Sequence, residues 1–304
     1  MRTDRKSLHH SLLLLLAAVI WGFAFVAQRA GMEHVGPFTF NALRFLLGSL
    51  SLLPVWLLTR RRVRRTGNAW HADDPPACPG LLLVGGVLFV AATLQQVGLL
   101  YTTAGKAGFI TGLYVVVIPV LGLLVRQRVR GTVWVGAVAA VGGLYLLTGS
   151  EAGRIGLGDG LLLAGAFAWA VHVQLVGWLA CRIDPIRIAV FQTSVCGLLS
   201  LVVALATESL ALAGLRAAVP ALLFAGILSV GIAYTLQIVG QRKVDPSRAG
   251  ILVSLEAVFA VFGGWAFLGE RVTSVMLIGC ALMLAGMILS QLRRPDRLRD
   301  SAKA

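Results

Sequence analysis

Long apolar stretches, separated by short polar, glycine-containing or proline-containing segments, dominate this chain. A helix needs about 20 mainly apolar residues to cross the hydrocarbon core of a bilayer. Ten stretches approach that length: residues 11–28, 37–58, 80–100, 105–125, 132–148, 160–179, 185–206, 219–239, 249–268 and 274–292. The pattern predicts an all-α integral membrane protein with ten transmembrane helices.

The composition agrees with a membrane protein, because 58% of the residues are hydrophobic and only 13% are charged. Soluble globular domains have a more even mixture. The longest polar connection, residues 59–79, is rich in proline and is interpreted as a surface loop. The four cysteines have no CxxC or Cys/His spacing. We therefore expect no cofactor, no metal site and no disulfide framework.

The formal net charge of +14 would indicate a nucleic-acid partner only if the basic residues gathered on one soluble face. Most of the 27 Lys and Arg residues instead fall in alternate loops, including residues 60–65, 126–130 and 242–248 and the segment after 292. The opposite loops contain Arg29, Lys106, Arg154, Arg216 and Arg271. The positive-inside rule then predicts that both termini are in the cytoplasm. We therefore expect a multi-pass protein of the cell inner membrane, surrounded by lipid. We expect no nucleic-acid partner.

The second half of the chain repeats the first. Identical residues recur at an offset of 142 or 148 positions: Thr93-Leu94-Gln95 with Thr235-Leu236-Gln237, Ala107-Gly108 with Ala249-Gly250, Trp21 with Trp169 and Pro37 with Pro185. Each repeat holds five predicted spans, so the repeats, residues 11–149 and 150–292, should have opposite orientations in the bilayer. Residues 1–10 and 293–304 are then cytoplasmic ends, and the first span is not a cleaved signal peptide. Inverted repeats are typical of secondary transporters, whose site lies near the midplane.

Two segments resemble the paired EamA domains of the drug/metabolite transporter superfamily: Ala107-Gly108-Phe109-Ile110-Thr111-Gly112-Leu113-Tyr114 through Pro119, and Leu255-Glu256 through Gly269-Glu270-Arg271. The resemblance extends from about Ser11 to Leu292. It implies two inverted five-helix units around a substrate cavity, and transport of metabolites such as amino acids, sugars or nucleotide-related compounds. One departure is Ala257, where the second domain commonly has a proline, so a helix kink beside Glu256 lacks its usual cause.

Two charged residues lie about 10 Å into predicted spans, at the usual rise of a helix. A carboxylate at Glu256 must be paired or protonated, so it could bind a cationic group or couple transport to protons. The alternative is a neutral glutamic acid that is hydrogen-bonded between helices. Arg44 could bind an anionic substrate, or it could snorkel toward the surface or bond to helix-end carbonyl groups.

Two further basic residues and a group of aromatic and polar side chains complete the candidates. Lys106 and its repeat mate Arg248 begin the fourth and ninth spans, where they could guard the cavity mouths or anchor helix ends at the interface. Intramembrane polar groups seldom face lipid, and a pocket for a mixed solute needs an aromatic wall with a few polar tips. The candidate substrate-binding residues are Trp21, Gln95, Tyr114, Trp169, His172, Tyr234 and Glu256. Phe25 and Gln28 share the face of Trp21, and Gln237 adds another polar tip. The alternative for any single one of these side chains is a role in helix packing. The gating or charge-coupling candidates are Arg44, Lys106, Arg248 and Glu256.

Small residues are assigned structural roles. Helix-packing seams are predicted at Gly108, Gly112, Gly136 and Gly143 and at the later glycines Gly279 and Gly286. The pair Gly269-Glu270 is interpreted as an interfacial turn that ends the ninth span.

An intramembrane enzyme and a channel are the two alternatives to a transporter. The sequence Gly156-Leu157-Gly158-Asp159 fits the GxGD pattern of intramembrane aspartyl proteases. Such enzymes need two aspartates that share a proton, but no second aspartate lies within a predicted span. Asp159 itself lies just before a predicted helix, where an N-cap residue is expected. A channel or facilitator would need a ring of pore-lining charges or carbonyl groups. We therefore predict a non-enzymatic secondary transporter, monomeric or homodimeric, that exports a small metabolite or drug-like compound by alternating access.

Overall fold

The structure is a computed structural model that describes residues 2–66, 79–127, 129–148, 156–209 and 211–291. Within these ranges every regular element is a helix, as predicted. The first half comprises α1 (Arg2–Met32), α2 (Pro37–Thr66), α3 (Pro79–Gly98), the 3-10 turn η1 (Leu99–Tyr101), α4 (Ala104–Gly112), α5 (Tyr114–Leu124) and α6 (Gly131–Thr148). The second comprises α7 (Leu157–Ala180), α8 (Pro185–Thr207), α9 (Leu212–Leu223), the π-helix η2 (Phe224–Ala233), α10 (Tyr234–Gln241), α11 (Pro246–Val253), α12 (Glu256–Leu268) and α13 (Ser274–Gln291). Most of the predicted polar loop, residues 67–78, lies outside the described residues.

The described part of the chain contains eight helical stretches that are long and apolar enough to cross a membrane. They are Leu8–Met32, Pro37–Thr59, Pro79–Tyr101, Ala104–Leu124, Leu157–Ala180, Pro185–Thr207, Leu212–Gln241 and Pro246–Leu268. The remaining two predicted spans correspond to α6 and α13, whose apolar parts, Gly131–Gly143 and Ser274–Gly286, are shorter. Large apolar side chains such as Leu124 and Phe267 are 75% and 72% exposed, as expected where lipid covers the surface. The multi-pass membrane class is therefore confirmed, whereas ten spans stay a prediction.

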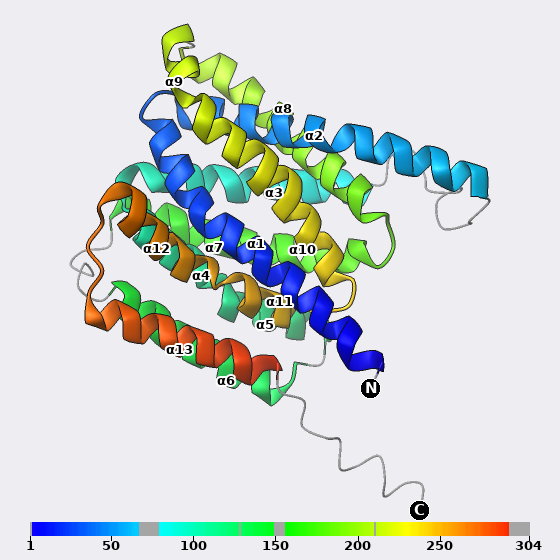
Figure 1. Cartoon of the computed structure of the whole chain (residues 1–304), viewed down its shortest axis with the longest axis vertical. Coiled ribbons are helices and arrows are strands. Elements are labelled where there is room, and N and C mark those ends of the chain that lie inside the picture. Colours follow the sequence, from blue (N-terminus) through cyan, green and yellow to red (C-terminus); the bar gives the residue numbers. More distant parts are fainter. Residues whose placement is uncertain (1, 67–78, 128, 149–155, 210, 292–304) are drawn as a thin grey trace, which may run out of the picture.

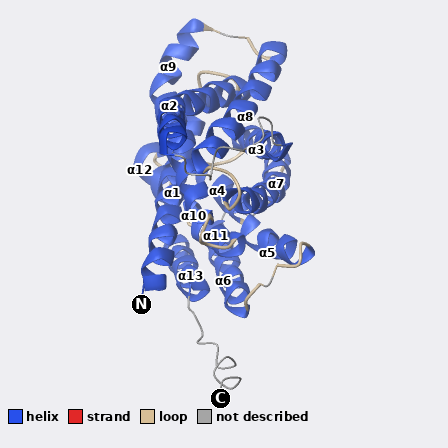
Figure 2. Ribbon diagram, turned by 90° about the vertical axis from the view of Figure 1, so that its right-hand side faces the viewer, coloured by secondary structure: helices blue, strands red, loops and turns tan. Residues whose placement is uncertain are grey.

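The helices form one bundle that α1 crosses diagonally (Figure 1). Helices α6 and α13 lie side by side along one edge, while α2 packs on α8 and α3 on α7. The turned view in Figure 2 places α8 and α9 toward one end of the molecule and α6 and α13 toward the other. The start of α1 and the end of α13 lie on the same side of the bundle, at the right of Figure 1.

The predicted glycine seam is confirmed between α6 and α13. A Cβ atom added at Gly143 would lie 2.5 Å from the backbone oxygen of Gly279. One added at Gly286 would lie 2.8 Å from the backbone oxygen of Gly136. The two backbones touch at both positions, as small residues allow in membrane helix pairs.

This seam predicts a position-specific loss of stability. Gly143→Ala forces a methyl group against the backbone of α13, and overpacking of this kind costs about 1–3 kcal/mol. The neighbouring Gly142→Ala is the matched control, because its Cβ would be 3.3 Å from only the flexible end of Leu282. We expect Gly143→Ala, and not Gly142→Ala, to lower the melting temperature of the purified protein in detergent. Equal melting temperatures for the two variants would contradict the seam.

The turn after α12 also has the predicted form. Gly269 ends the helix in the left-handed region, with φ 67°, a conformation that favours glycine. The backbone N–H of Glu270 then donates to the carbonyl oxygen of Gly264 at 3.1 Å, which closes the helix end.

Candidate functional site

Three of the long helical stretches are interrupted near their middle. One residue separates α4 from α5, two separate α11 from α12, and the π-helix η2 separates α9 from α10. The residues that follow the interruptions directly are Tyr114, Glu256 and Tyr234. The predicted spans 105–125, 219–239 and 249–268 run through these interruptions. Irregular backbone at membrane depth is tolerated where it is buried in protein or lines a cavity, and π-helical segments are frequent at functional sites.

The interruption beside Glu256 occurs although Ala257 replaces the proline that would explain a kink. A local hydrogen bond provides another cause: the Ser254 hydroxyl donates to the carbonyl oxygen of Ile251 at 2.9 Å. Such side-chain bonds compete with the helical backbone pattern and often bend helices.

Tyr114 and Glu256 meet across the two halves of the chain. The Tyr114 hydroxyl donates to Oε1 of Glu256 at 2.9 Å, and both side chains are buried. The two residues are 142 positions apart, which is the offset of the sequence repeat. Residues from the first and second halves of the chain are therefore in direct contact in the interior of the protein.

A cavity opens around this contact and contains about 480 Å³ of unfilled space, any opening to the outside included. The lining residues are Trp21, Phe25, Gln28, Arg44, Gln95, Tyr114, Trp169, Val173, Ser229, Tyr234, Gln237, Val253 and Glu256. Six of the seven candidate substrate-binding residues thus line one cavity, together with Arg44.

Hydrogen bonds hold the amide and indole groups of the wall in place. Trp169 Nε1 donates to Oε1 of Gln95 at 2.9 Å, and Gln95 Nε2 donates to Oε1 of Gln28 at 3.3 Å. Trp21 Nε1 donates to the carbonyl oxygen of Ser229, in the π-helix, at 3.1 Å. Because these polar atoms already have partners, the indole rings present mainly their apolar faces to the cavity.

The Tyr234 ring lies between the two indole side chains. Its centroid is 4.9 Å from that of Trp21, in an edge-on contact, and 6.4 Å from that of Trp169, in a stacked one. Offset and edge-on geometries are the favoured aromatic contacts. Three aromatic residues from α1, α7 and α10 therefore form a continuous wall.

Arg44 is 4% exposed and faces the cavity, so the alternative that it snorkels toward the membrane surface is wrong. Its Nε donates to Oδ1 of Asn41 at 3.0 Å, and its guanidinium carbon lies 4.7 Å from the centroid of the Phe45 ring. Asn41 is itself held by the carbonyl oxygen of Ala92 at 3.3 Å. Within the described ranges, Arg44 has no carboxylate within ion-pair distance.

His172 is fully buried but does not line the cavity, which corrects its predicted place. Its Nε2 lies 3.0 Å from Oε1 of Gln192, and its ring contacts those of Trp169 and Tyr234 edge-on. The histidine thus supports the aromatic wall from behind.

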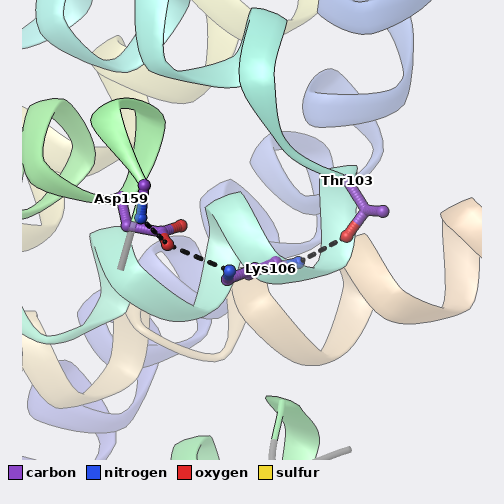
Figure 3. Close-up of polar contacts among 4 residues, drawn as sticks. Thr103, Lys106 and Asp159 are labelled. Carbon is purple, nitrogen blue, oxygen red and sulfur yellow. Dashed lines mark hydrogen bonds and ion pairs between the residues drawn. The ribbon is translucent and has the colours of Figure 1, made fainter. Parts of the chain in front are cut away.

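Lys106 and Arg248 lie away from the cavity, at the starts of α4 and α11. Nζ of Lys106 lies 3.0 Å from Oδ2 of Asp159 on α7, and the backbone N–H of Lys106 donates to the Thr103 hydroxyl. Figure 3 shows both contacts. Arg248 has a similar local arrangement, because its backbone N–H and its Nε lie 3.0 and 3.8 Å from oxygens of Asp245. The two basic residues therefore sit on N-cap turns and do not meet.

Asp159 also has a different place from the predicted N-cap. Helix α7 begins at Leu157, and Asp159 is in its first turn, where its carboxylate accepts the backbone N–H of Gly156 at 3.0 Å. The same carboxylate is bound to Lys106. The GxGD segment is therefore a helix start with an ion pair.

Sequence reasoning did not find three of the lining residues: Val173, Ser229 and Val253. The two valines carry no chemical signal, and Ser229 contributes a backbone oxygen to the Trp21 contact. Only the packing of distant helices brings them to the cavity.

Comparisons with known proteins agree with this architecture. The model of the EamA-like transporter family matches residues 10–149 and 156–292. An uncharacterized transporter of Archaeoglobus fulgidus is 31% identical over 95% of this chain and 87% of its own length. A WAT1-related chloroplast protein of Arabidopsis thaliana is 25% identical over 91% of this chain and 68% of its own. A protein of known crystal structure shares the fold, with a TM-score of 0.73 and 21% identity over 93% of this chain and 96% of that one. The chain is a multi-pass membrane protein that belongs to the EamA-like transporter family.

Proposed function

We propose that this protein is a secondary transporter that moves a small metabolite or drug-like compound across the cell inner membrane by alternating access. The observation that carries the proposal is the contact between Tyr114 and Glu256, which joins equivalent positions of the two halves inside the central cavity. A site shared by two inverted repeats can be exposed to either side of the membrane by rocking one repeat against the other. The proposed direction is export, and the proposed assembly is a monomer or homodimer.

Ten spans in two inverted repeats are part of the same proposal, and paired features support them. Thr103 and Asp245, 142 positions apart, are the N-caps of α4 and α11. Tyr114 and Glu256, at the same offset, begin the helices after the interruptions. Helix α2 packs on its counterpart α8, and both helices start at a proline. Helix α6 likewise packs on its counterpart α13.

In the proposed resting state, the cavity is closed on the side opposite to the start of α1 and the end of α13. At the helix ends on that side, three carboxylates of the second half contact the first half, and we call these the latch contacts. Glu208 accepts hydrogen bonds from the backbone N–H groups of Phe38 and Thr39 at 2.9 and 2.8 Å. Glu270 accepts one from the backbone N–H of Ala104 at 3.3 Å, and Asp159 forms an ion pair with Nζ of Lys106 at 3.0 Å. Carboxylates at helix N-termini are favourable because they accept unpaired N–H groups.

The repeat has no equivalent acids for the opposite side. The residues 148 positions before Asp159 and Glu208 are Ser11 and Arg60, and the residue 142 positions before Glu270 is Arg128. The latch contacts therefore break the symmetry of the repeat. This asymmetry supports a resting state that is closed on the latch side, which is the outer side if both termini are cytoplasmic.

A pair of tryptophans on α7 tests the proposed function. Trp169 lines the cavity, whereas Trp178 is 50% exposed on the outside of the bundle. We expect Trp169→Ala to reduce substrate counterflow in proteoliposomes by roughly tenfold, equivalent to ~1.4 kcal/mol of lost binding. Trp178→Ala should leave the flux unchanged. The substrate would come from a counterflow screen of radiolabelled metabolites with the purified wild-type protein.

Two results would count against the proposed function. One is a wild-type protein that catalyses no counterflow with any compound of a broad metabolite screen. The other is a Trp169→Ala variant whose flux equals that of Trp178→Ala, because the cavity would then lie outside the transport path.

A further inference from the structure

We infer that the cavity binds an organic monoanion, with a carboxylate held by Arg44 and a flat apolar body against the aromatic wall. This inference rests on the proposed function and names the class of substrate. Arg44 is the only Lys or Arg that lines the cavity among the described residues. Any charge selection for anions inside the cavity must therefore come from this side chain.

The charge of Arg44 has no counter-ion among the residues that the structure describes. Its Nε is bound to the neutral amide of Asn41, and no described protein group is hydrogen-bonded to the two terminal guanidinium nitrogens. The nearest rings, Phe45 and Phe40, are 4.7 and 5.9 Å from the guanidinium carbon. Aromatic faces attract a cation, but a buried charge also requires pairing or water.

Glu256 is the acid of the same cavity, yet it does not serve as this counter-ion. Its contact is with the Tyr114 hydroxyl, and it lies beyond ion-pair distance from Arg44. The cavity thus holds one cation and one acid at separate places. A ligand with its own negative charge would act as the counter-ion of the guanidinium. A carboxylate suits this role, because the planar guanidinium can donate two parallel hydrogen bonds to it.

The surroundings favour a singly charged ligand with an aromatic or similarly flat body. One guanidinium balances one negative charge, so a phosphate dianion would remain half compensated in a desolvated site. The rest of the wall consists of Trp21, Trp169 and Tyr234, which bind flat apolar groups by stacking and edge contacts. These properties together describe an aromatic monocarboxylate.

Three probes that differ only in their polar group test the inference: phenylacetate, its neutral isostere phenylacetamide, and the cation 2-phenylethylamine. We expect phenylacetate to compete in counterflow and to be taken up into proteoliposomes with wild-type protein at least tenfold better than either analogue. This comparison needs no variant, so it holds even where a substitution harms folding.

Variants of Arg44 then test whether this side chain causes the preference for phenylacetate. Arg44→Gln should abolish the preference for phenylacetate over phenylacetamide, and Arg44→Lys should retain part of it. Arg182→Gln is the matched control, because Arg182 also lies over an aromatic ring, that of Trp178 at 4.5 Å, but is exposed. A wild-type protein that favours phenylacetamide or 2-phenylethylamine would overturn the inference while the transport function stands. It would also be overturned if none of the probes competed with an established substrate, or if Arg44→Gln kept the preference.

Discussion

Glu256→Gln is expected to reduce transport driven by a pH gradient by roughly tenfold or more, and to remove the pH dependence of the remaining flux between about pH 5 and pH 9. Glutamine preserves the size of the side chain and an acceptor for the Tyr114 hydroxyl, but it cannot gain or lose a proton. Glu256 is 6% exposed, lines the cavity and lies at the interruption between α11 and α12. An ionisable group at this place can carry a proton between the two states of the transporter. Accumulation in proteoliposomes under an imposed pH gradient is the measurement.

Two companion variants separate the charge from its surroundings. Tyr114→Phe removes the hydroxyl that donates to Glu256 and should change the pH profile without abolishing transport. Glu33→Gln replaces an exposed acid after α1 and should behave as wild type. If Glu256→Gln accumulates substrate with the wild-type rate and pH profile, Glu256 has no part in coupling.

Removal of the latch contacts should open the side of the cavity that they close. The triple variant Asp159→Asn, Glu208→Gln, Glu270→Gln loses the charged acceptor of each latch contact. At a net value of about 1 kcal/mol for each contact, the balance between the two states would shift on the order of a hundredfold. A cysteine at Gln28, introduced after replacement of the native cysteines, reports this change. Its labelling by a membrane-impermeant maleimide should become much faster from the latch side.

Asp245→Asn is the matched control for the triple variant. Asp245 also holds a helix N-terminus, that of α11, but its contacts are with Arg248 of the same turn and do not join the halves. This substitution should leave the labelling rate at Gln28→Cys near that of the unaltered protein. If the triple variant labels at the same slow rate as Asp245→Asn, the latch contacts do not hold the cavity closed.

The site was only partly predictable from the sequence. Trp21, Gln95 and Trp169 could be chosen because polar and aromatic groups in a membrane helix seldom face lipid. The same rule also selected His172, which lies behind the wall and does not line the cavity. The error arises because helical periodicity shows which face of a helix a residue is on, but not which neighbour packs against that face. Arg44 had three possible orientations from its depth alone. Its place in the cavity follows from Asn41 and Phe45, which hold the side chain away from the surface.

The sequence by itself determined the membrane class, the apolar stretches, the repeat offsets and the glycines that form helix-packing seams. These features follow from local rules, since a span needs a length of apolar residues and close helix packing needs small ones. Only the tertiary structure decided that Tyr114 and Glu256 meet beside helix interruptions, that Arg44 faces the cavity with no counter-ion in the described part of the chain, and that three acids join the halves on one side. Each depends on contacts between residues far apart in the chain, and no local pattern encodes which distant backbone or side chain will be the partner.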